Sequence, residues 1–87
     1  MLMDQKIFAM NLSLEATSAY IIICSLAESG APITIESAGS FWNASPEALI
    51  NALEELCRHS VIDQELDSNH VRRYFLNPAD LWEMPAE

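Results

Sequence analysis

The segment Ser45-Pro46-Glu47 constrains the fold more than any other, because its three residue types together mark the start of a helix. Serine is a preferred N-cap residue, proline fits the first helical position, and an acidic residue suits the first turn. A helix is therefore expected over residues 45–59, ending near His59. Its apolar spacing predicts buried Leu49, Ile50, Leu53, Leu56 and Cys57. Asn43-Ala44 predicts the turn before it, because Asn tolerates a positive φ better than most residues.

Two further helices are predicted upstream of this turn. Residues 12–28 repeat apolar side chains at helical spacing, with one side made of Leu12, Ala16, Ala19, Tyr20, Ile23, Leu26 and Ala27. Gly30 is expected to close this helix, and Pro32 prevents it from resuming. Ile33-Thr34 can form a very short strand, after which Thr34 caps a second helix that runs to Phe41 or Trp42. That helix is expected to bury Ile35, Ala38 and Trp42.

Residues 61–66 and 71–76 alternate like two strands, and the turn-rich segment 67–70 joins them as a hairpin. Asn77-Pro78 then begins a last short helical turn. The order of elements is helix, short strand, helix, turn, helix and hairpin. This order predicts a mainly α fold, a winged helix-turn-helix with three core helices and a two-stranded wing. One domain covers residues 1–87, with an apolar arm or helix at 1–11 and a short helical segment at 77–87.

Length and charge exclude several classes of protein. The 87 residues carry 13 acidic and four basic side chains, a net charge of −9, which repels phosphate backbones. Cys24 and Cys57 sit inside apolar helical patterns and do not form a disulfide framework, which is typical of a reducing compartment. No signal peptide is visible, and the longest apolar run, residues 19–24, is too short to span a membrane. We therefore expect a cytoplasmic protein without a membrane contact.

The segment 34–46 fits the helix-turn-helix pattern without a gap, with Gly39 at the small-residue position and Asn43 at the tight turn. Leu49 and Leu53 supply the apolar contacts of the second helix of the pattern, and residues 72–78 look like the outgoing wing strand and the turn after it. With these residues the chain resembles bacterial winged-helix regulators of the multiple-antibiotic-resistance and arsenical-repressor type. The resemblance covers residues 34–81, and residues 12–30 more loosely. It implies a third helix that reads the major groove of DNA and a dimer formed through terminal helices.

The residues that would read DNA depart from this family. The exposed face of the helix at 45–59 would carry Glu47, Ala48, Asn51, Glu55 and Arg58, with a single base among them. Candidate DNA contacts are Asn51 and Arg58 on this helix and His70, Arg72 and Arg73 in the wing. Asn51 and Arg58 could equally be ordinary solvent-facing residues. One wing arginine could instead pair with Asp63, Glu65 or Asp67 across the hairpin.

The sequence indicates no catalytic, metal or cofactor site. Cys57, His59 and His70 lack metal-ligand spacing, because positions 57 and 59 of a helix point about 200° apart. No nucleophile elbow, glycine-rich phosphate loop or paired-carboxylate cleft is present. We therefore expect a protein that is not an enzyme and holds no cofactor.

Leu14 and Ile21 break the pattern of the first long helix, because they lie two turns apart on its polar side. Together with the apolar chain ends they form a candidate interface of Phe8, Leu14, Ile21, Leu81 and Trp82, to which Met84 adds further apolar surface. The first ten residues, with Leu2 and Met3, are unusually apolar for a free terminus. Either the ends fold over this helix and complete the core, or a second chain covers it. The sequence favours a binding module that acts by protein–protein contact or as a homodimer. The alternative is a DNA-binding transcriptional regulator that uses residues 45–59 and the wing.

Overall fold

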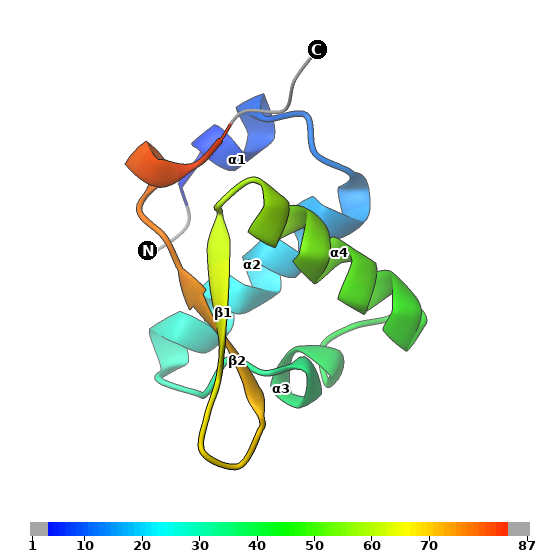
Figure 1. The fold of residues 1–87 in the computed structure, drawn as a ribbon. Coiled ribbons are helices and arrows are strands. Elements are labelled where there is room, and N and C mark those ends of the chain that lie inside the picture. Colours follow the sequence, from blue (N-terminus) through cyan, green and yellow to red (C-terminus); the bar gives the residue numbers. More distant parts are fainter. Residues whose placement is uncertain (1–3, 84–87) are drawn as a thin grey trace.

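Two helices that pack against each other, α2 (Leu14–Ser29) and α4 (Pro46–Arg58), form the centre of the fold. The computed structural model describes residues 4–83. Within this range the chain also forms α1 (Lys6–Ala9), α3 (Ile35–Gly39), the antiparallel strands β1 (Ile62–Leu66) and β2 (Arg72–Leu76), and a 3₁₀ turn, η1 (Ala79–Leu81). The molecule is thus a mixed α/β fold with four α-helices and one two-stranded hairpin in the described residues (Figure 1).

The helix starts follow the capping signals of the sequence. Ser45 accepts a hydrogen bond from the Ala48 N–H, and α4 begins at Pro46 as predicted. α2 begins at Leu14, two residues later than predicted, because Ser13 is its N-cap and accepts from the Ala16 N–H. Gly30 closes α2 at a φ of 77°, a left-handed conformation that glycine adopts without strain.

The connection between α3 and α4 differs from the prediction. α3 ends at Gly39, and the chain continues through a single turn in which Phe41 and Trp42 donate to Ala38 and Gly39. Asn43 lies in the connection between the two helices, as expected, but it has no positive φ, so the conformation predicted for this turn is wrong. The segment from Ser40 to Ser45 is long enough to reverse direction without that conformation.

The core lies between α2, α4 and the inner face of the hairpin. Ile23, Leu49, Leu53 and Leu56 are buried there, as predicted. Among residues 4–83, the buried side chains are Ile7, Met10, Ala16, Ala19, Tyr20, Ile23, Cys24, Leu26, Ala38, Leu49, Ala52, Leu53, Leu56, Val61, Ile62, Tyr74 and Trp82. Ile50 was predicted to be buried and is 37% exposed, because it lies at the edge of the α4 face centred on Leu49 and Leu53. Leu12, Ala27, Ile35, Trp42 and Cys57, expected inside, are half-buried.

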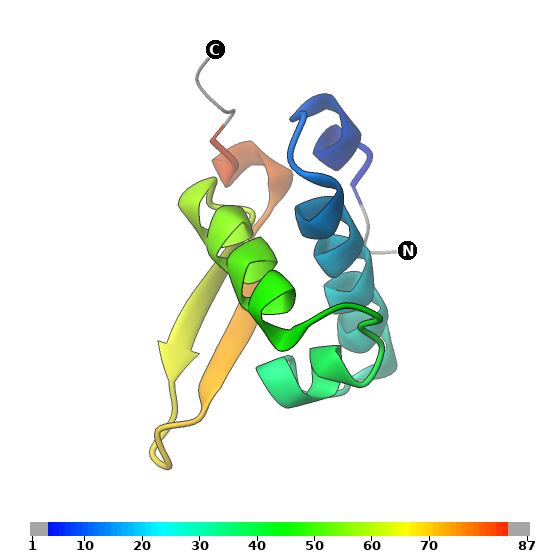
Figure 2. The same ribbon diagram turned by 90° about the vertical axis from the view of Figure 1, so that its right-hand side faces the viewer.

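α1 and η1, near the two ends of the described chain, lie at the same end of the molecule and complete the core (Figures 1 and 2). Ile7 and Met10 of the α1 region are buried, and the Lys6 Nζ donates to the Ala79 carbonyl at 2.9 Å. Trp82 is 6% exposed, and its ring meets that of Tyr20 edge to face, with centroids 5.5 Å apart. Burial raises the pKa of Tyr20 to about 12. The ends therefore pack on this chain itself; Leu2, Met3 and Met84 lie outside the described residues.

The hairpin pairs β1 with β2 so that Glu65 faces Arg73 and Ile62 faces Leu76. Each strand is one residue shorter than predicted, although hydrogen bonds at Val61 and Val71 extend the pairing. The predicted strand at Ile33-Thr34 is a single bridge from Thr34 to Arg73, supported by the Tyr74 N–H donating to the Ile33 carbonyl. This bridge ties the start of α3 to β2.

Candidate functional site

The side of α2 that faces away from α4 carries large apolar side chains. Leu14 is 77% exposed and Ile21 is 42% exposed, and Ser18 and Ser25 lie between and beyond them on the same side. We call this side, Leu14, Ser18, Ile21 and Ser25, the outer face of α2. The described chain ends leave both apolar residues exposed, although they cover the opposite side of the helix. The prediction that helical spacing places Leu14 and Ile21 away from the core is confirmed.

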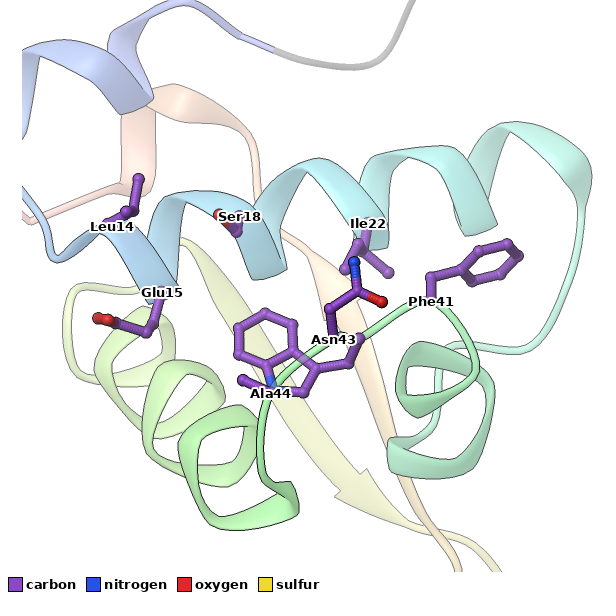
Figure 3. A pocket seen from close by; sticks show the side chains of 8 residues that line it. Leu14, Glu15, Ser18, Ile22, Phe41, Asn43 and Ala44 are labelled. Carbon is purple, nitrogen blue, oxygen red and sulfur yellow. The ribbon is translucent and has the colours of Figure 1, made fainter.

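A shallow groove runs between α2 and the connection from α3 to α4 (Figure 3). Its volume is about 280 Å³, and it is lined by Leu14, Glu15, Ser18, Ile22, Phe41, Trp42, Asn43 and Ala44. Phe41 is 62% exposed, and in Figure 3 its ring projects away from the connecting segment into solvent. The Trp42 indole N–H donates to the Ser45 carbonyl at 3.1 Å, which holds the indole at the start of α4. The groove therefore joins the outer face of α2 to an exposed aromatic ring.

Sequence reasoning missed Phe41, because it was assigned only as an end point of α3. A signal was available, since Phe41 stands beside Trp42 in a segment otherwise made of Gly, Ser, Asn and Ala. Two adjacent aromatic residues cannot both face the core from one turn. One of them is therefore left on the surface.

The candidate interface residues divide between core and surface. Phe8 and Leu81 are exposed together with Leu14 and Ile21. Trp82 was expected at the interface and is instead a core residue. Its ring packs on Tyr20, and its indole N–H donates to the Asn77 carbonyl at 2.9 Å.

The candidate DNA contacts are spread over α4 and the hairpin. Asn51 and Arg58 are exposed on α4, where they line a shallow depression that Glu54, Glu55 and Gln64 also line. Arg72 lies on the hairpin beside Gln64, Glu65 and Leu66, and His70 is exposed in the turn. The structure thus places two carboxylates next to the single base of α4.

Glu55 was expected on the exposed face of α4 and is turned toward α2 instead. Its carboxylate accepts from the Ser13 N–H at 2.9 Å and from the Ser13 hydroxyl at 2.7 Å. The two hydrogen bonds fasten the start of α2 to the middle of α4. Glu55 therefore has a structural role in joining the central helices.

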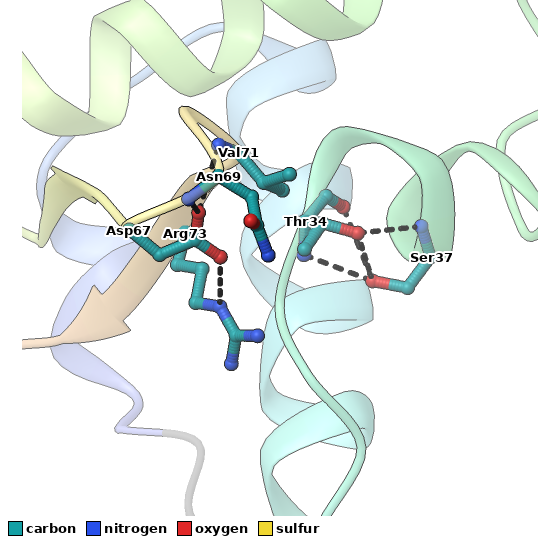
Figure 4. Close-up of polar contacts among 6 residues, drawn as sticks. All are labelled: Thr34, Ser37, Asp67, Asn69, Val71 and Arg73. Atoms are coloured by element: carbon teal, nitrogen blue, oxygen red, sulfur yellow. Dashed lines mark hydrogen bonds and ion pairs between the residues drawn. The ribbon is translucent and has the colours of Figure 1, made fainter.

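The hairpin turn is organised around Asp67 (Figure 4). Its carboxylate accepts from the Val71 N–H at 3.0 Å, the Asn69 N–H at 2.8 Å and the Arg73 Nε at 3.3 Å. The bond from Val71, followed by those from Asn69 and Arg73, holds the pKa of Asp67 below its ordinary value. Of the two hairpin arginines, Arg73 is therefore the one that pairs with an acidic residue of the hairpin, as the ion-pair alternative predicted.

Groups that could carry chemistry are dispersed in the described structure. Within residues 4–83, no group of three or more His, Cys, Asp or Glu side chains is arranged to hold a metal ion. The His59 Nδ1 lies 3.1 Å from the Glu83 carbonyl, and Cys24 and Cys57 are unpaired thiols. Burial raises the pKa of both thiols, which lowers the fraction of reactive thiolate.

No helix in residues 4–83 is both long enough and apolar enough to cross a membrane. Comparison with known proteins shows no match of the chain to a family model, a curated protein or a solved structure. The surface itself is therefore the basis for a functional assignment.

Proposed function

We propose that this chain is a non-catalytic winged-helix module that binds protein through the outer face of α2 and the adjoining groove. The observation that carries the proposal is a groove whose lining includes the exposed residues Leu14 and Phe41, with exposed Ile21 on the adjoining outer face of α2. A contiguous apolar patch of this kind is typical of a site that another surface covers. The order of helices, the bridge at Thr34 and the hairpin that follows α4 support the winged-helix assignment.

DNA binding by α4 and the hairpin has less support. Arg73 is engaged by Asp67, and Arg58 shares its depression with Glu54 and Glu55. Lysine and arginine supply most of the affinity for a phosphate backbone. The five candidate residues therefore present a weak cationic surface on a chain of net charge −9.

The proposal is tested by sedimentation velocity and by titration with a helical Leu/Gln peptide of about 20 residues, longer than the roughly 12–15 residues below which isolated helices are marginal in water. Binding is followed by the shifts of backbone amide NMR signals. We expect the outer face of α2 and Phe41 to respond to the peptide or to a second copy. The double variant Leu14→Glu/Ile21→Glu should abolish that response.

The matched control is Leu66→Glu/Phe75→Glu, which makes the same change of charge at exposed apolar residues of the hairpin. It should leave binding on α2 intact. A wild-type protein that stays monomeric and shows no shifts on α2 with any helical peptide would contradict the proposed function.

A further inference from the structure

The occupant of the groove can be inferred from the charges around it. Residues 7–57 contain no Lys, Arg or His, and their six charged side chains are all glutamates. This stretch supplies the whole outer face of α2, α3 and the connection to α4. The charged side chains that these segments contribute are therefore all negative.

One of these glutamates, Glu15, lines the groove. Glu36 is exposed on α3 and lines a neighbouring depression that shares Trp42 and Ala44 with the groove, and Glu47 is exposed in the first turn of α4. Among the described residues, none of the three forms an ion pair with a cation of this chain. Their charges are available to a partner.

A second copy fits this surface poorly. The four basic residues are Lys6, Arg58, Arg72 and Arg73, and none of them lines the groove. Two copies that met on this face would bring like charges together, at −9 per chain, without a base to compensate them. Like-charge contacts across an interface favour other partners. The homodimer expected from the sequence is thus the less favourable occupant.

The size and shape of the surface indicate a peptide element as the partner. The groove volume of about 280 Å³ lies just below the roughly 300–1,000 Å³ of sites that enclose a drug-sized molecule. It suits one or two anchoring side chains. Leu14 and Ile21 are two helical turns apart, a rise of about 10 Å, which matches the spacing of apolar anchors along one face of a helix.

We propose that the groove binds a basic amphipathic helix of another protein, whose apolar residues contact Leu14, Ile21 and Phe41 and whose Lys or Arg residues meet Glu15 and its neighbours. This inference rests on the proposed function and names the chemistry of the partner. Apolar contacts supply the affinity, and the surrounding glutamates favour a partner helix that carries positive charge.

The test compares three peptides of equal length and leucine pattern, with Lys, Gln or Glu on the polar face, by NMR titration against the wild-type protein. The Lys peptide should bind at least about tenfold more tightly than the Gln and Glu peptides at about 50 mM salt. The difference should shrink toward about 500 mM, because exposed charges are screened.

Matched variants separate this groove from general attraction to an acidic protein. Leu14→Glu should lower the affinity for the Lys peptide about ten- to a hundredfold, because an apolar anchor is lost. Leu66→Glu, with the same change of charge on the hairpin, should have little effect. Glu15→Gln should weaken binding about two- to fivefold, as for an exposed ion pair, and Glu65→Gln should not.

Each outcome decides between the alternatives. Equal binding of the Gln or Glu peptide, or equal losses in Leu14→Glu and Leu66→Glu, would overturn the basic-helix inference. A dimer that Leu14→Glu/Ile21→Glu dissociates would make a second copy the occupant, with the protein-binding function intact. A monomer that binds none of the three peptides on α2 would overturn both.

Discussion

α2 and α4 pack against each other at the centre of the molecule, yet they present different surfaces to solvent. α4 is apolar only where it faces the core, and its outward side carries Glu47, Asn51 and Arg58 with Ile50 at the margin. α2 is apolar on both sides, since Leu14 and Ile21 lie opposite Ala16 and Ile23. A polar outward face is satisfied by water, whereas an apolar one gains free energy when it is covered. In the winged-helix arrangement proposed above, α4 would take the place of the helix that reads DNA, and its outward side is polar. The exposed apolar side chains lie on α2 instead.

The largest expected effect is on the free energy of unfolding, in which a core leucine of α4 should differ from a surface leucine of α2. Leu53 is 2% exposed, so Leu53→Ala should lower the free energy of unfolding by about 2–5 kcal/mol. Leu14→Ala should change it by no more than about 0.5 kcal/mol. Urea unfolding followed by circular dichroism measures both. A cost well above this for Leu14→Ala would mean that the outer face is already covered at the protein concentration used.

The second prediction concerns the point where the two helices are fastened together. Glu55→Ala removes the acceptor of both hydrogen bonds from Ser13 and should cost about 1–3 kcal/mol, because partly buried donors lose their partner. Its neighbour Glu54 is exposed, and Glu54→Ala should stay within about 0.5 kcal/mol of the wild type. Equal effects of the two variants would place Glu55 in solvent, as the sequence pattern suggested.

Features that depend on local chemistry could be predicted from the sequence. The Ser45-Pro46 start, the Gly30 end and the hairpin turn each follow from a few neighbouring residues, and all three are at or within a residue of their expected positions. The inward residues Ile23, Leu53 and Leu56 follow from helical spacing alone. The exposure of Leu14 and Ile21 follows from the same spacing.

Features that depend on long-range contacts could not be predicted. Trp82 is buried because the C-terminal turn reaches Tyr20, some sixty residues earlier, and periodicity does not report such a contact. Helical spacing assigns Glu55 to the exposed side of α4, and only the position of Ser13 reveals that it is turned toward α2. The groove could not be foreseen either, since it forms where the connection from α3 to α4, residues 41–44, runs beside α2.

The smallest expected effect is the binding of duplex DNA, which tests the polar outward side of α4 together with the hairpin. At about 150 mM salt we expect binding no tighter than about 10⁻⁴ M, the weak end of nonspecific affinity. The reason is the shortage of available cations on α4 and the hairpin: Arg58 lies beside Glu54, and Arg73 is bound to Asp67. Fluorescence anisotropy with mixed-sequence duplexes, repeated at lower salt, gives the affinity and its salt dependence.

The double variant Arg72→Ala/Arg73→Ala is the control for this measurement. Because the protein can neutralise so few phosphates, the variant should bind duplex DNA about as weakly as the wild type at about 150 mM salt. Submicromolar DNA binding that this double variant weakens would contradict the prediction. The functional surface would then be α4 and the hairpin, and the apolar face of α2 would serve another purpose.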